Sequence, residues 1–279
     1  MYPQALIEFT FFGKEIGIYL YGICIAIGLV ACISVFYIYS KKAGVHEDIR
    51  DFVFFVAVIA IAIGFLSAKF FQALYDYLSS GVWDFMGAGL TVMGGLVGGV
   101  ATGVALYFIA GAVLFKKRDN MHIKQVNDIF RVLPCCVTIA HAFGRLGCLF
   151  AGCCYGRVAE DGHGILIRGV ARVPVQLYES LFLFALFIVL SILFFKKFNL
   201  THVVYLIAYG IWRIVIEIFR ADYRGGVDGA LLTPSQWQSC GFIALGLAVL
   251  VVFIIIKVPI FVKKKEESVI TEQTKEITE

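Results

Sequence analysis

The sequence predicts an all-α integral membrane protein with about seven transmembrane helices, from its composition and from the length of its apolar runs. Of the 279 residues, 60% are hydrophobic and 16% are charged, and the mean hydropathy is +0.88. A soluble domain carries about 25% charged residues. Seven apolar runs approach or exceed the ~20 residues that a membrane-spanning helix needs. They cover residues 16–38, 52–74, 89–115, 128–151, 177–195, 201–219 and 237–262.

The runs differ in what they contain. The first follows an acidic residue, Glu15, and is long enough to span a bilayer, so we expect a retained helix rather than a cleavable signal peptide. The third contains Gly94-Gly95-Leu96-Val97-Gly98-Gly99, whose overlapping Gly-x-x-x-Gly pairs favour tight helix packing and would also let a lipid approach the backbone. Polar residues interrupt the fourth and sixth runs, so we expect the chemistry there.

The distribution of Lys and Arg predicts the topology. Clusters of these residues follow the first, third, fifth and seventh runs, whereas the loop 75–88 has none. The loops 157–176 and 220–236 carry arginines against this trend, either as solvated charges or to bind a phosphate or carboxylate. The positive-inside rule then places the N-terminus outside and the C-terminus in the cytoplasm. We expect one membrane domain over 1–262 and a charged, disordered cytoplasmic tail over 263–279. No nucleic-acid-binding module is found, so no nucleic-acid partner is expected.

The fourth run places an arginine, Arg145, in an apolar segment, where burying a charge is energetically unfavourable. In a helix, His141, Arg145 and Cys148 share one face, and Gly144 and Gly147 beside them permit close approach of a backbone or a headgroup. An intramembrane arginine is a functional-site hypothesis by default and needs an anionic partner. That partner is either a phospholipid phosphate, which suits a bidentate guanidinium, or a carboxylate from another helix.

The sixth run offers a second half of the same site. Helical spacing places Arg213, Glu217 and Arg220 on one face. Arg213 and Glu217 would form an intrahelical ion pair, or Glu217 would orient Arg213 so that Arg213 and Arg145 hold one phosphate.

The fifth run opens with Gln176-Leu177-Tyr178-Glu179, directly after Pro174 and Val175. Polar groups at the start of a transmembrane helix either anchor it at the membrane interface or line a cavity there. The sequence alone does not choose between these interpretations.

Taken in order, these motifs resemble the bacterial prolipoprotein diacylglyceryl transferase family. The resemblance rests on Tyr21-Gly22, Gly94 to Gly98, Gly144-Arg145-Leu146-Gly147, Gln176 to Glu179 and Tyr209-Gly-x-x-Arg-x-x-x-Glu-x-x-Arg220, and it runs over almost the whole chain. It implies transfer of the diacylglyceryl group of phosphatidylglycerol to the thiol of a lipobox cysteine in a prolipoprotein, with release of glycerol phosphate. It also implies a multi-pass protein of the bacterial cytoplasmic membrane, with an active site toward the outer leaflet and no metal or cofactor.

The resemblance assigns roles to particular residues. Arg145 and Arg213 become the phosphate-binding candidates, since negative charge develops on the departing phosphate, and Glu217 becomes their orienter. His141 is the candidate base. The wider set expected to bind substrate is Arg145, Gly144, Gly147, Cys148, Gly156, Tyr21, Gly94, Gly95, Gln176, Tyr178, Glu179 and Arg220.

The chain departs from the family at several of its polar positions. After Gly-Arg-x-Gly the family has Asn-Phe-x-Asn and then a polar residue, where this chain has Cys148, Leu149, Ala151 and Cys153. Met93 stands in place of a family histidine, and a thioether cannot act as a base. His141 would then take over as the base, with a neighbouring arginine keeping its imidazole neutral, or it is a hydrogen-bonded packing residue.

Cys148, Cys153 and Cys154 form a cluster that this family pattern does not explain. Three interpretations are open. The cysteines pack against their neighbours or form a disulfide, or one of them contacts the substrate or accepts the lipid transiently. Alternatively, they bind a soft metal together with His141 or His163. Their spacing matches no standard zinc site. The alternative functions are a phosphatidylglycerol-dependent transferase with another acceptor, and a non-catalytic membrane lipid-binding or transport protein.

Overall fold

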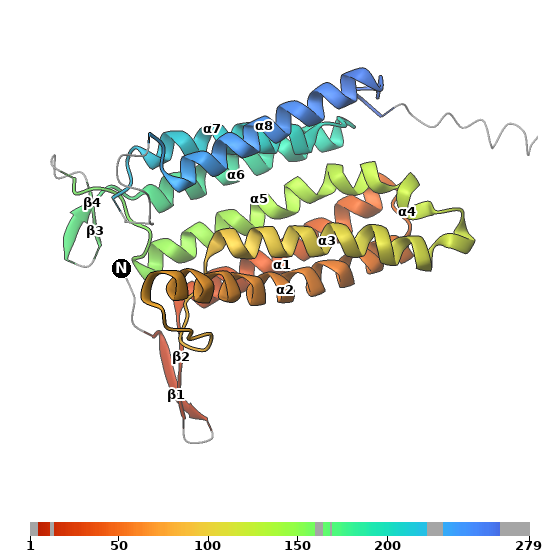
Figure 1. Ribbon diagram of the computed structural model, residues 1–279. Helices are drawn as coiled ribbons and strands as arrows, with labels where there is room; N and C mark the ends of the chain where they lie inside the picture. The colour runs from red at the N-terminus through yellow and green to blue at the C-terminus, as the bar shows by residue number, and fades with distance from the viewer. Residues whose placement is uncertain (1–4, 12–13, 160–163, 168, 222–230, 263–279) are drawn as a thin grey trace, which may run out of the picture. The chain divides into compact units, whose positions relative to one another are not determined.

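The computed structural model describes residues 5–11, 14–159, 164–167, 169–221 and 231–262 (Figure 1). The predicted tail 263–279 and His163 lie outside these residues. The described chain is mostly helical, which confirms the all-α membrane class. It forms two compact units, one made of residues 1–38 and 130–279 and the other of residues 39–129.

Long helices account for most of the described chain. Six are long and apolar enough to cross a membrane; a further helix, α7, has 17 residues and is therefore about 26 Å long. The seven-span count and the orientation of the termini remain predictions. The helices are α1 (Leu20–Ala43), α2 (Glu47–Ser80), α3 (Val92–Leu114), the short η1 (Lys116–Arg118) and α4 (Met121–Lys124), α5 (Val126–Ala151), α6 (Val175–Phe195), α7 (Thr201–Glu217) and α8 (Pro234–Ile255).

Two antiparallel hairpins were not expected from the sequence. Strands β1 (Ile7–Phe11) and β2 (Lys14–Ile18) pair in the first, and β3 (Ile165–Ile167) and β4 (Val170–Arg172) in the second (Figure 1). The first apolar run, expected to be helical from residue 16, therefore begins inside β2. Hydropathy locates an apolar segment but not its start, and Gly17 is a weak helix former, by about 1 kcal/mol relative to alanine. The hairpin satisfies these backbone groups, and the helix begins after it.

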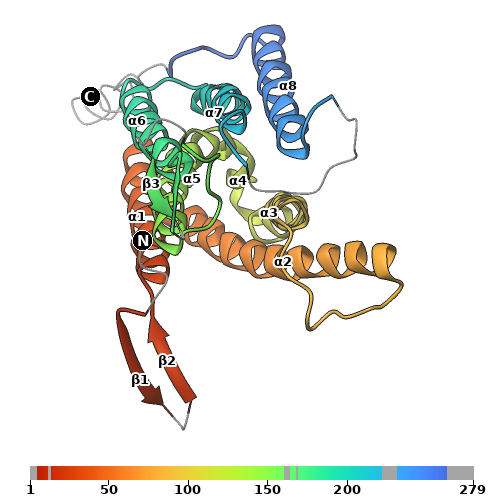
Figure 2. The ribbon, with the colours of Figure 1, turned by 90° about the vertical axis from the view of Figure 1, so that its left-hand side faces the viewer.

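In the unit 39–129, α2 and α3 lie side by side and pack through small residues (Figure 2). A Cβ added to Gly64 would lie 3.2 Å from the carbonyl oxygen of Gly95, and one added to Gly94 would lie 2.6 Å from Cβ of Phe71. The Ser67 hydroxyl donates a hydrogen bond to the carbonyl of Gly94 at 2.8 Å. These contacts favour the packing interpretation of the glycine run.

In the unit 1–38 with 130–279, polar side chains join the helices at their buried faces. Ser180 of α6 donates to the carbonyl of Ala142 in α5 at 2.9 Å, and Thr201 of α7 donates to the carbonyl of Arg131 in α5 at 2.9 Å. Hydroxyls suit this role because each satisfies a carbonyl within a medium that supplies no water. These hydrogen bonds join α5, α6 and α7, and predicted site residues lie toward the end of α5, at the start of α6 and toward the end of α7.

Candidate active site

Glu179, near the start of α6, lies at the centre of the site. Its side chain is fully buried, and its Oε1 lies 2.9 Å from Nη2 of Arg145. The same oxygen accepts a hydrogen bond from the hydroxyl of Tyr209 at 3.1 Å and lies 3.9 Å from Nε2 of His141. Helices α5, α6 and α7 thus converge on one carboxylate. This confirms a carboxylate partner for Arg145, and the full burial of Glu179 argues against a role as an interfacial anchor.

A second ion pair lies within the last turns of α7. Nη2 of Arg213 lies 2.9 Å from Oε2 of Glu217, four residues along the helix, and Nε of Arg220 lies 3.9 Å from that oxygen. The hydroxyl of Thr233, the N-cap of α8, donates to Oε1 of Glu217 at 3.2 Å. The predicted intrahelical pair is therefore confirmed, and Glu217 is held from both sides. These contacts fix the position of the carboxylate beside Arg213.

The two ion pairs belong to one charged region. Arg145, Arg213 and Arg220 all act electrostatically on Glu179. Their guanidinium groups gather around the carboxylates Glu179 and Glu217. Guanidinium groups grouped in this way suit an anionic ligand such as a phosphodiester.

Several guanidinium N–H groups of this region have no hydrogen-bond acceptor among the described residues. They are Nε of Arg145 and both Nη atoms of Arg213, all buried. The contact between Arg213 and Glu217 is short, but it lacks the angles of a hydrogen bond. An unsatisfied buried donor costs about 1–3 kcal/mol, and more when it is charged. The site therefore presents unused, charged donors that an anionic ligand would satisfy.

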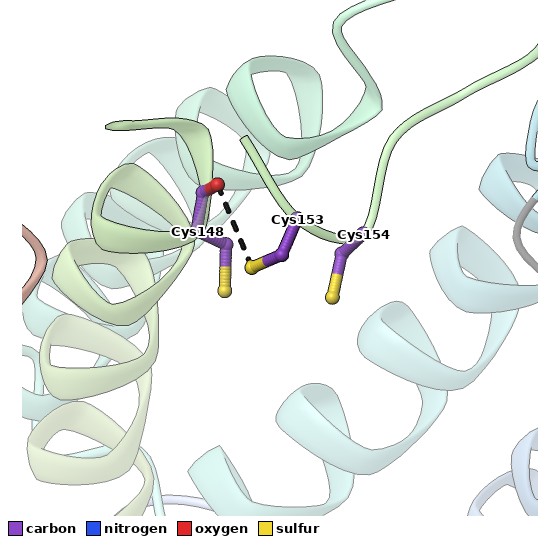
Figure 3. A group of neighbouring side chains, drawn as sticks. All are labelled: Cys148, Cys153 and Cys154. Atoms are coloured by element: carbon purple, nitrogen blue, oxygen red, sulfur yellow. Dashed lines mark hydrogen bonds between the residues drawn. The ribbon is translucent and has the colours of Figure 1, made fainter. Parts of the chain in front are cut away.

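The three cysteines of the cluster converge at the end of α5 (Figure 3). Cys148 lies in its last turn, and Cys153 and Cys154 follow on the loop. The three Sγ atoms lie within 4.8 Å of one another, and Sγ of Cys153 contacts the carbonyl of Cys148 at 3.7 Å. None of the eight cysteines forms a disulfide in the structure. The loop turns back because Gly152 and Cys154 both have left-handed backbones, with φ of 65° and 58°.

Other predicted residues support the loop that carries these cysteines. Gln176 is fully buried, and its Nε2 donates to the carbonyl of Cys153 at 2.6 Å. A Cβ added to Gly156 would lie 2.5 Å from the carbonyl oxygen of Val173, and one added to Gly147 would lie 3.1 Å from the ring of Tyr21. These three positions have a clear role in packing; their predicted part in substrate binding stays a prediction.

The remaining predicted residues have other surroundings. Gly94 and Gly95 lie in α3 of the unit 39–129, where they pack against α2, and Tyr178 is 43% exposed. A Cβ added to Gly144 would meet no atom closer than 3.9 Å. Tyr21 is 45% exposed and lines a cavity of about 580 Å³ with residues of β2, the first turns of α1 and the end of α5.

Two contributors were missed by the sequence reasoning. Tyr209 hydrogen-bonds Glu179 and packs its ring edge-on against His141, with centroids 5.2 Å apart. The sequence did contain an indication of Tyr209, because this residue is the first of the Tyr-Gly-x-x-Arg motif in the sixth run. Thr233 holds Glu217; the only local signal was the Thr-Pro-Ser-Gln pattern of a capping box at the start of α8.

Comparisons with known proteins identify the family of the chain. A family described as prolipoprotein diacylglyceryl transferase matches residues 8–252. The chain is 30% identical over 254 residues to phosphatidylglycerol–prolipoprotein diacylglyceryl transferase from Clostridium tetani (strain Massachusetts / E88), covering 86% of this chain and 94% of that protein. It is 32% identical over 225 residues to the protein of the same name from Clostridioides difficile (strain 630), covering 77% and 83%.

Proposed function

Because the chain belongs to the prolipoprotein diacylglyceryl transferase family, we propose that it transfers the diacylglyceryl group of phosphatidylglycerol to a prolipoprotein in bacterial lipoprotein biosynthesis. The acceptor is the thiol of the lipobox cysteine. A carbon–sulfur bond forms as the carbon–oxygen bond to the phosphate breaks, and glycerol phosphate leaves. The protein acts in the cytoplasmic membrane, with its site toward the outer leaflet.

This proposal rests on the guanidinium N–H groups of Arg145 and Arg213 that have no acceptor among the described residues. The side chains of these two arginines are only 12% and 7% exposed. The phosphodiester of phosphatidylglycerol brings one negative charge and oxygens that suit a guanidinium fork. When the carbon–oxygen bond breaks, a second negative charge develops on the departing phosphate. Fixed N–H donors stabilise this charge more in the transition state than in the ground state.

The carboxylates hold the arginines in place for this task. Glu179 contacts Arg145 from another helix, and Glu217 contacts Arg213 from the same helix. Each arginine still has guanidinium nitrogens without an acceptor among the described residues. Because both carboxylates are already paired with arginines, neither is suited to take a proton from the acceptor thiol.

His141 is the proposed base for that thiol. Its side chain is 27% exposed, its ring packs edge-on against Tyr209, and its Nε2 lies 3.9 Å from Oε1 of Glu179. Arg145, one turn away, disfavours a second positive charge and so keeps the imidazole neutral and able to accept a proton. His141 thus supplies the function of the family histidine that is Met93 in this chain.

The test is a transfer assay with purified protein in phosphatidylglycerol-containing detergent micelles. A lipobox peptide is added, and mass spectrometry follows the diacylglyceryl peptide and glycerol phosphate. The matched control is the same peptide with serine in place of its cysteine, which should give no product. Glycerol phosphate released without modified peptide would instead favour another acceptor. Bound lipid without turnover would favour the lipid-binding alternative, and either result would overturn the proposal.

A further inference from the structure

The cysteine cluster places three thiols where one metal ion can be bound. Cys148, Cys153 and Cys154 bring their Sγ atoms within 4.8 Å of one another (Figure 3). In a tetrahedral site with Zn–S bonds of ~2.3 Å, ligand sulfurs lie about 3.8 Å apart. Each pair therefore needs to approach by about 1 Å or less, which a small side-chain rotation supplies.

We propose that Cys148, Cys153 and Cys154 bind one Zn²⁺ ion whose fourth position takes the cysteine thiol of the acceptor peptide. The proposed acceptor rests on the function inferred above. The metal site itself rests on the three thiols alone, so the two parts can fail separately.

The backbone around the cluster is built to hold the thiols together. Cys154 has φ of 58°, a left-handed conformation that residues with a Cβ seldom adopt outside functional or specially held sites. Gly152, with φ of 65°, makes the turn that returns the chain toward Cys148. Gln176, fully buried on α6, binds the carbonyl of Cys153 at 2.6 Å and fixes the loop. In metal sites such outer contacts orient the ligands.

The number of thiols favours zinc with an open position. Thiolates select soft or borderline ions such as Cu(I) and Zn²⁺. Cu(I) is coordinatively satisfied by three thiolates and would leave no place for a substrate. Zinc prefers four ligands, and three protein ligands with one open position are typical of its catalytic sites. Among the described residues, no fourth Cys, His, Asp or Glu joins the cluster. The fourth coordination position of the zinc is therefore available to a ligand that is not part of this chain.

The surrounding charge also suits zinc. Three thiolates around Zn²⁺ carry one net negative charge, and the Arg145 guanidinium acts electrostatically on Cys148 and Cys154. Arg145, proposed to bind the phosphate, and Cys148, proposed to bind the metal, are three residues apart on α5 and so lie on one side of that helix. The proposal thus brings the acceptor sulfur and the phosphate of the lipid to the same end of α5.

The chemistry balances without an oxidant or reductant. The acceptor thiol binds Zn²⁺ and loses its proton, which passes through water to His141. The sulfur then attacks the glyceryl carbon of phosphatidylglycerol, and the carbon–oxygen electron pair leaves with the phosphate. The products are a thioether, which binds zinc weakly and departs, and glycerol phosphate with one more negative charge. Metal coordination supplies a thiolate at neutral pH where this chain has Met93 in place of the family histidine.

Metal content tests the site directly. Purified protein in detergent, with its thiols reduced, is titrated with Zn²⁺ against a colorimetric chelator. We expect one ion per chain, and affinity lower by at least about 100-fold in Cys148→Ser, Cys153→Ser and Cys154→Ser. Cys240→Ser, in α8, is the matched control and should bind as the wild type does. Absence of binding, or equal binding by the triple serine variant, would overturn the proposal.

Cobalt spectroscopy tests the open position on wild-type protein, so it does not depend on variants that fold poorly. Co²⁺ in place of zinc should give intense sulfur-to-metal charge-transfer and tetrahedral d–d bands. Adding the lipobox peptide should strengthen these bands, whereas the serine peptide should leave them unchanged. An unchanged spectrum with the cysteine peptide would overturn the role of the acceptor thiol.

The transfer assay then separates the two proposals. Removal of zinc with a chelator should lower peptide modification at least 100-fold, and added Zn²⁺ should restore it. Full activity of the metal-free protein would refute the zinc role and leave the transferase function standing. Peptide thiol entering the metal's coordination shell without any transfer from phosphatidylglycerol would refute the transferase function and leave the metal site standing.

Discussion

The two units of this protein use opposite means to join apolar helices. In the unit 39–129, α2 and α3 meet through small, uncharged residues such as Gly64 and Gly94, in van der Waals contact and with a hydrogen bond from Ser67 to the carbonyl of Gly94. In the other unit, α5, α6 and α7 meet around Glu179, Arg145 and further charged side chains. Small residues already suffice to pack membrane helices. The buried charges are therefore better explained by a ligand than by stability, because desolvation offsets much of what an ion pair contributes.

The largest expected effect is at Arg145. Arg145→Ala should lower transfer by at least about 10³-fold, because it removes a donor to the departing phosphate and leaves Glu179 buried without its partner. Arg145→Lys should restore only part of the rate, since an ammonium lacks the guanidinium fork. The assay is peptide modification followed by mass spectrometry. Arg118→Ala, an exposed position in the other unit, is the control and should keep the wild-type rate. A normal rate in Arg145→Ala would remove the phosphate-binding argument.

The next effect is at His141. His141→Gln keeps the size and polarity of the side chain but cannot take the thiol proton, so we expect a loss of about 10²-fold in the transfer rate. Raising the pH should recover part of this loss, because more of the acceptor thiol is then ionised. A rate profile over pH distinguishes this from a packing role, for which the loss would not depend on pH. Wild-type transfer in His141→Gln would eliminate the base assignment.

A glycine of the other unit should affect stability rather than chemistry. A Cβ at Gly98 would lie 2.2 Å from the hydroxyl of Ser67, so Gly98→Val should destabilise the protein by about 1–3 kcal/mol through overpacking. Thermal unfolding in detergent measures this. Gly241→Ala in α8, where an added Cβ meets nothing within 4 Å, is the matched control and should unfold like the wild type or later. Equal unfolding temperatures for Gly98→Val and wild type would show that α2 and α3 pack differently.

The smallest effect concerns His122, in the short α4 outside the apolar helices. It is buried, its ring nitrogens have no hydrogen-bond partner among the described residues, and burial lowers its pKa. The unfolded chain therefore binds a proton at higher pH than the folded chain does. Its stabilising contribution is present above the unfolded pKa of ~6.5 and is lost as the pH falls below it. The unfolding temperature should fall less between pH 7.5 and pH 5.5 in His122→Phe than in the wild type. An equal fall in both proteins would contradict this prediction.

Hydropathy predicted most of the fold, and its failures have a local cause. The apolar runs located all seven long helices to within a few residues at most ends, because the membrane requires continuous apolar segments with internally satisfied backbones. The hairpin of β1 and β2 was missed because hydropathy does not distinguish an apolar strand from the first turns of a helix. Helical spacing also predicted the pair of Arg213 and Glu217, which are four residues apart.

By itself, the sequence determined the membrane class, the family motifs and those contacts that lie within one helix, since these depend on composition and on a fixed helical repeat. Tertiary structure alone decided that Arg145 pairs with Glu179, that Tyr209 joins them, and that the thiols of Cys148, Cys153 and Cys154 face one another. Such contacts depend on how separate helices and a left-handed turn are placed. No local repeat encodes that placement, because it follows from the packing of the whole helical unit.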